Sequence, residues 1–112
     1  MAKPVILAVD DDPQVLAAVR RDLRSQYAAD YQILAAPSGA DALGIVTELS
    51  EGGRTIAVFL VDQRMPDMTG TEFLLEAQKT YPEAKRLLLT AYADTEAAIQ
   101  AINEVGLDHY LQ

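Results

Sequence analysis

Apolar residues occur along the chain in short unbroken runs that alternate with stretches of helical periodicity. A run of six apolar residues spans Ile56–Val61, and a run of five spans Val5–Val9. Such runs, rich in Val, Ile and Phe and bounded by Gly- or Pro-containing segments, are typical of strands buried on both faces. Shorter apolar segments at Tyr31–Ala36 and Arg86–Leu89 predict two more strands, and Leu107–Gln112 predicts the entry into a fifth.

The stretches between these runs carry signals for the start and end of helices. Their apolar residues recur at spacings of three and four, which predicts amphipathic helices with one buried face. The predicted starts are Asp12 as an N-cap followed by Pro13, the capping-box pairs Ser38 with Asp41 and Thr69 with Glu72, and Asp94 as an N-cap. The predicted ends are the region Tyr27 to Asp30, Gly52 with Gly53, the residues before Pro82, and Gly106.

Strand and helix therefore alternate with short connections, which indicates a parallel sheet covered by helices on both faces. We expect an α/β fold of the flavodoxin-like, doubly wound type with strand order 2-1-3-4-5. With 112 residues, half of them hydrophobic, the chain predicts one domain over residues 1–112. It ends in the predicted fifth strand without a last helix, so we expect a C-terminally shortened domain.

Composition narrows the classes of function. The chain has no cysteine, which excludes disulfides and thiolate metal sites, and its single histidine is His109. A formal net charge of −8 disfavours direct contact with nucleic acid. No apolar run is long enough for a bilayer and no secretory leader is evident at Met1–Pro4, so we expect no membrane partner and a cytoplasmic location.

Candidate chemistry lies where the predicted strands end. Asp10 and Asp11 follow the first strand, Asp62 ends the third, and Thr90 ends the fourth. Carboxyl ends of parallel strands share one edge of the sheet, so these side chains should converge. Clustered carboxylates repel one another unless a cation joins them, and Mg²⁺ is the natural candidate. The alternative is that these acids and Thr90 are ordinary strand-end and helix-capping residues without a metal. A single helix cap explains Asp12, however, and leaves Asp10 and Asp11 without a role.

At this point the sequence resembles the receiver domain of bacterial two-component response regulators. The matching segments are VILAVDDD, VFLVDQRMPDMTG, LLLTAYAD and GLDHYL, and together they extend over almost the whole chain. The resemblance implies that Asp62 is the phospho-acceptor. It also implies that Asp10, Asp11 and Asp62 hold Mg²⁺ with the backbone carbonyl of Arg64. Thr90 would be the switch hydroxyl and Tyr110 the mobile aromatic residue, with the small Ala91 leaving room for phosphate.

The function implied is that of a signalling module which takes a phosphoryl group from a sensor histidine kinase or a phosphotransfer protein. Its only catalysis would act on itself, and phosphorylation would alter the face formed by the fourth helix and the fifth strand to control an output domain or partner protein. The resemblance also allows a homodimer. Arg64 and Tyr92, two residues beyond Asp62 and Thr90, would screen the acyl phosphate from water. The family's lysine after the fifth strand would come just beyond Gln112.

Two other functions fit parts of the sequence. An Asp-x-Asp spacing after a strand, here Asp10 and Asp12, also occurs in haloacid-dehalogenase-like phosphohydrolases that use Mg²⁺. Against that reading, the chain is short, has no cap domain, and has Pro13 where those enzymes have a turn. The third reading is a pseudo-receiver that only binds partners. The intact acids disfavour it and the missing lysine favours it.

Overall fold

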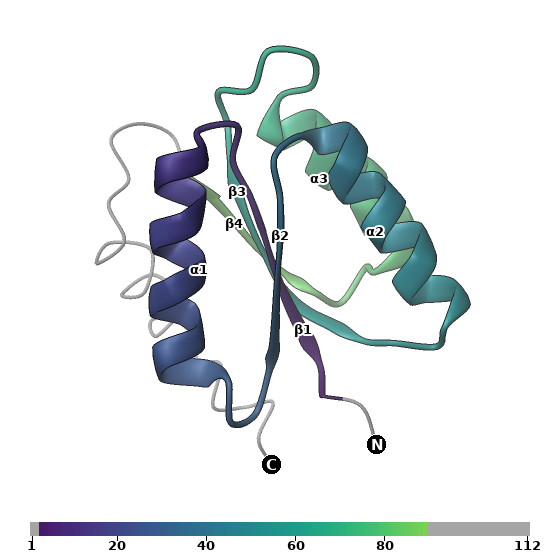
Figure 1. Cartoon of the computed structure of the whole chain (residues 1–112). Helices are drawn as coiled ribbons and strands as arrows, with labels where there is room; N and C mark the ends of the chain where they lie inside the picture. The colour runs from purple at the N-terminus through teal and green to yellow at the C-terminus, as the bar shows by residue number, and fades with distance from the viewer. Residues whose placement is uncertain (1–2, 90–112) are drawn as a thin grey trace.

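The structure of the protein, a computed structural model, describes residues 3–89 (Figure 1). Over these residues strands and helices alternate strictly, as the apolar pattern predicts. The elements are β1 (Val5–Val9), α1 (Pro13–Tyr27), β2 (Gln32–Ala36), α2 (Gly39–Glu51), β3 (Ile56–Asp62), α3 (Gly70–Thr80) and β4 (Lys85–Leu89).

The strands form one parallel sheet in the order β2-β1-β3-β4. Helix α1 covers one face of this sheet, and α2 and α3 lie side by side on the other (Figure 1). The predicted doubly wound α/β architecture and the order of its first four strands are thus confirmed. The predicted helix after Asp94 and the predicted strand at Leu107–Gln112 lie outside the described residues.

The central strands β1 and β3 are buried on both faces, which explains their unbroken apolar runs. Residues of β1 alternate, so that Val5, Leu7 and Val9 face α2 and α3, while Ile6 and Ala8 face α1. The pairing of β1 with β3 shifts between Val5 and Ile6. Two cores result, one on each face of the sheet.

Three of the four predicted helix starts lie within the described residues and agree with the structure, while the fourth, at Asp94, lies outside them. Asp12 caps α1, Ser38 caps α2 through the Asp41 amide, and Thr69 forms a complete capping box with Glu72. Helix α2 ends at Glu51, followed by Gly52 as the C-cap and by Gly53 at a φ of 70°. In the ranges that the structure describes, no helix is both long and apolar enough to cross a bilayer.

Two strand boundaries differ from the prediction by one residue. The strand predicted from Tyr31 begins at Gln32, because the Tyr31 amide still donates to the carbonyl of Tyr27, 2.8 Å away, at the end of α1. Tyr31 is nevertheless buried, so its apolar character reflects the core rather than the strand. The strand predicted from Arg86 begins at Lys85, which pairs with a residue of β3.

Candidate functional site

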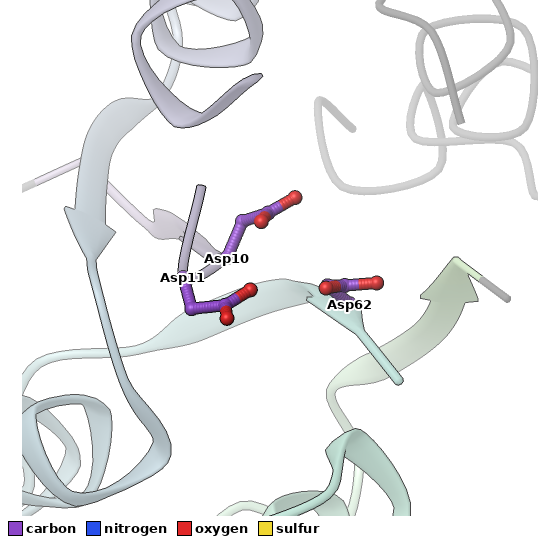
Figure 2. A group of neighbouring side chains, drawn as sticks. All are labelled: Asp10, Asp11 and Asp62. Carbon is purple, nitrogen blue, oxygen red and sulfur yellow. The ribbon is translucent and has the colours of Figure 1, made fainter. Parts of the chain in front are cut away.

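Three carboxylates come together at the carboxyl end of the sheet (Figure 2). Asp10 follows β1 directly, Asp11 is the next residue, and Asp62 is the last residue of the neighbouring strand β3. Each offers an oxygen, and these oxygens all lie within 4.8 Å of one another. The parallel pairing of β1 with β3 thus brings together acids that are about fifty residues apart in the sequence.

The loop after β1 gives each of its acids a separate task. The amide of Asp10 donates to Ala36 in β2 over 3.2 Å, which extends the sheet by one residue. Asp10 Oδ1 accepts from the amide of Asp12 at 2.9 Å, which turns the chain toward α1. The side chain of Asp12 accepts from the first amides of α1. Asp12 is therefore the helix cap, while Asp10 and Asp11 remain for the cluster, as the sequence predicts.

Burial and mutual repulsion act on the two half-buried acids of the cluster. Desolvation raises the pKa of Asp10, the hydrogen bond from Asp12 opposes this, and the charges of Asp62 and Asp11 raise it further. Desolvation likewise raises the pKa of Asp62, opposed first by a hydrogen bond from the Arg64 backbone. Nearby negative charge from Asp11 adds to the rise. The site as built thus has an excess of negative charge.

This donor set suits a hard divalent cation. Mg²⁺ binds oxygen ligands, uses one or two carboxylates, and keeps several waters. The half-buried Asp10 and Asp62 and the exposed Asp11 offer carboxylate oxygens with room for solvent on one side. A shallow depression beside the cluster is lined by Asp11 and by the start of the loop after β3, including Gln63 and Arg64. The residues present therefore fit Mg²⁺ by chemistry and by spacing.

Two residues that shape the connection between β3 and α3 were not predicted from the sequence, namely Gln63 in the loop and Gly70 at the start of α3. A Cβ on Gly70 would lie 2.7 Å from the carbonyl oxygen of Asp62 and 2.7 Å from Cδ1 of Leu88, so α3 approaches the end of β3 too closely for a side chain. Gln63 accepts hydrogen bonds from the first turn of α3. The signal in the sequence was a glycine at the first position of a helix, directly after the capping threonine, where nothing in the helix itself requires one.

The structure brings together Asp10, Asp11 and Asp62, and places Arg64 with an exposed side chain in the adjoining loop. The other predicted site residues, which are Thr90, Ala91, Tyr92 and Tyr110, lie outside the described residues. Their roles stay predictions.

Comparison with known proteins gives a consistent result. The model of the response regulator receiver domain family matches residues 6–112. The hydrogenase transcriptional regulatory protein HoxA of Cupriavidus necator is 33% identical over 106 residues, which cover 95% of this chain and 20% of HoxA. The chain thus spans about a fifth of that relative's length.

Two solved structures share both the fold and more than a quarter of the aligned residues with this chain. A CheY-like receiver domain protein from Methanospirillum hungatei JF-1 has a TM-score of 0.67 at 28% identity, covering 91% of this chain and 75% of that one. A structure described as adenylate cyclase from Rhodopirellula baltica has a TM-score of 0.67 at 33% identity, covering 92% and 70%. With a family match over almost the whole length and the sheet order of that fold, the chain belongs to the response regulator receiver domain family.

Proposed function

We propose that this chain is a phospho-accepting receiver in which Asp62 takes a phosphoryl group from a phosphohistidine of a sensor histidine kinase or phosphotransfer protein. The observation that carries the proposal is the cluster of Asp10, Asp11 and Asp62, with oxygens within 4.8 Å, at the strand ends of a receiver-family chain. We assign the cation site to these three carboxylates and the backbone carbonyl of Arg64, with Mg²⁺ as the cation.

The chemistry is a transfer between two nucleophiles. An ionised oxygen of Asp62 attacks phosphorus, the bond between phosphorus and the histidine nitrogen breaks, and the electron pair of that bond stays on the imidazole. Such transfers depend on alignment and on neutralising charge. Bound Mg²⁺ supplies the neutralising charge. The protein supplies alignment, because β3 fixes Asp62 beside Asp10 at the edge of a rigid central sheet.

The response to phosphorylation rests on residues beyond β4. In our proposal the hydroxyl of Thr90 donates a hydrogen bond to the phosphoryl group, beside the small Ala91, and Tyr110 turns inward. Phosphorylation then shifts the equilibrium between two existing packings of the face formed by the fourth helix and the fifth strand. We also propose that Arg64 and Tyr92 screen the acyl phosphate from water and so slow its hydrolysis. The chain therefore acts on itself rather than turning over a substrate.

The output is proposed to be another domain or protein. HoxA is named a transcriptional regulator, and most of its length has no counterpart in this chain. The net charge of −8 disfavours DNA contact by the receiver itself, so a DNA-directed output would need a separate domain. A kinase-supplied phosphoryl group implies a cytoplasmic setting. A second copy of the chain is a further candidate partner.

The phosphohydrolase alternative is less well supported than the receiver. It would pair Asp10 with Asp12, but the Asp12 side chain accepts from the amides of Gln14 and Val15 at the start of α1. The cluster of neighbouring carboxylates contains Asp11 in its place. This division of tasks favours a receiver.

The test is labelling of the chain with acetyl phosphate and Mg²⁺, read by intact mass and peptide mapping. The parent should gain one phosphoryl equivalent, and Asp62→Asn should gain none. Asp30→Asn, which removes the same charge from an exposed turn after α1, is the matched control and should be labelled like the parent. Undiminished labelling of Asp62→Asn would refute the assignment, and continuous release of phosphate from a phosphomonoester would favour the hydrolase.

A further inference from the structure

Gln63, the residue after Asp62, closes the loop between β3 and α3 with both its backbone and its side chain. Its carbonyl oxygen accepts from the amides of Met65 and Gly70, each at 3.2 Å. Its side-chain Oε1 accepts from the amide and from the hydroxyl of Thr71, each at 2.9 Å. Since a backbone amide can only donate, the side chain of Gln63 must present its oxygen to Thr71. Both ends of the loop are thereby tied to one residue.

These contacts also complete the hydrogen bonding at the start of α3. The first amides of a helix have no partner within the helix. Here Gly70 donates to the carbonyl of Gln63, Thr71 donates to its side chain, and Glu72 donates to the hydroxyl of Thr69 at 3.1 Å. Two of the three partners come from Gln63, a residue outside the helix. Gln63 is therefore a second, remote cap of α3.

The position of this cap links it to the acid cluster. Gln63 joins Asp62, a member of the carboxylate cluster, to Arg64, whose backbone carbonyl is the fourth proposed ligand of the cation. Gly70, which follows the loop, packs so closely against the Asp62 carbonyl that a Cβ there would lie 2.7 Å from its oxygen. A rotation of the Gln63 peptide would move the Arg64 backbone relative to Asp62, and the hydrogen bonds of the Gln63 side chain to Thr71 oppose such a rotation. The loop geometry next to the site thus depends on the contact between Gln63 and Thr71.

The choice of an amide also matters for charge. Asp10, Asp11 and Asp62 already place three carboxylates together. A glutamate at position 63 would offer the same acceptor oxygens to α3 but would add a fourth negative charge beside them. Glutamine accepts two hydrogen bonds at α3 without that cost.

We infer that Gln63 is a positioning residue for the cation site, which holds the Asp62–Arg64 backbone in place by bracing it against Thr71 in α3. The inference rests on the proposed function, because it takes the carboxylate cluster as a Mg²⁺ site. Residues that orient metal ligands without touching the metal affect affinity by roughly 10- to 100-fold. Gln63 acts in this way from outside the ligand set.

The test compares the Kd for Mg²⁺, measured by titration calorimetry, with the thermal midpoint of each variant in chelator. Gln63→Leu, which keeps the bulk and removes the acceptor, should weaken Mg²⁺ binding by about tenfold or more. Thr71→Val keeps the amide but loses the hydroxyl, so it should weaken binding less, and Thr71→Ser should restore the parent value. Gln78→Leu makes the same exchange at an exposed position of α3 and should leave the Kd unchanged.

The outcomes separate the possible failures. A lowered thermal midpoint of Gln63→Leu with the parent Kd would show a purely structural role and overturn the inference while sparing the proposed function. If Gln63→Leu fails to fold, an unchanged Kd in Thr71→Val overturns it equally. A parent chain that binds no Mg²⁺ would overturn the proposed function and the inference together.

Discussion

The carboxylate cluster leads to a prediction about stability in the absence of a cation. In Asp11→Asn, one of three neighbouring negative charges is removed while the shape of the side chain is kept. Asp11 is exposed and its carboxylate accepts none of the capping hydrogen bonds that Asp10 and Asp12 accept. The variant should therefore be more stable than the parent in chelator, although it alters a proposed ligand.

The magnitude follows from the spacing. At 4.8 Å, two unit charges repel by about 0.9 kcal/mol in water and by about 3.5 kcal/mol at an effective dielectric constant of 20. Because Asp11 is exposed, the value for water is the better guide. Relief from two neighbours then amounts to about 1–2 kcal/mol, and each kcal/mol raises the thermal midpoint by about 4 °C in a domain of this size.

The assay is thermal and urea unfolding at low salt, in chelator and with Mg²⁺. Saturating Mg²⁺ at a hundred times its Kd should stabilise the parent by about 2.7 kcal/mol, whereas Asp11→Asn should gain much less. Asp30→Asn serves as the control for the change in net charge, since it lies in the turn between α1 and β2. The reasoning fails if Asp11→Asn is less stable than the parent in chelator, or if Mg²⁺ stabilises both chains equally.

Two further predictions concern the start of α3. Gly70→Ala places a Cβ 2.7 Å from the Asp62 carbonyl oxygen, so the loop must shift. Urea unfolding should show that the free energy of unfolding falls by about 1–3 kcal/mol. A variant as stable as the parent would contradict this close approach. Hydrogen bonds from the Thr69 backbone and side chain lower the pKa of the Glu72 carboxyl. The ionised carboxylate therefore stabilises the fold at pH values above its ordinary pKa of 4.5. This contribution disappears as the pH falls through the lowered pKa of the folded state. Glu72→Gln should thus be less stable than the parent at neutral pH and approach it in acid, and a deficit independent of pH in unfolding experiments would exclude this role.

Much of the described fold could be predicted because its signals are local. The apolar runs of β1 and β3 specify strands buried on both faces, and the alternation with amphipathic segments specifies a parallel sheet. Asp12 and Thr69 mark helix starts through hydrogen bonds that span two or three residues. Signals of this range are readable without knowing where the rest of the chain lies.

The acid cluster could also be predicted, for a topological reason. All strands of a parallel sheet end on the same edge, and β1 pairs directly with β3, so the acids at the ends of these two strands meet there. The resemblance to receivers then supplied their roles. The assignments of Thr90 and Tyr110 remain predictions, since these residues lie outside the described part of the chain.

The contacts that shape the loop beside the cluster were decided by the tertiary structure alone. Gln63 has no pattern that marks it as a cap, because its partner Thr71 is eight residues away and their meeting depends on the path of the whole loop. Gly70 is required by the approach of α3 to the end of β3, a distance that only the packed structure fixes. Sequence thus determined which groups reach the edge of the sheet, because periodicity and strand direction are local and topological properties. Packing determined how the loop holds them, because hydrogen bonds across a loop depend on where both of its ends are placed.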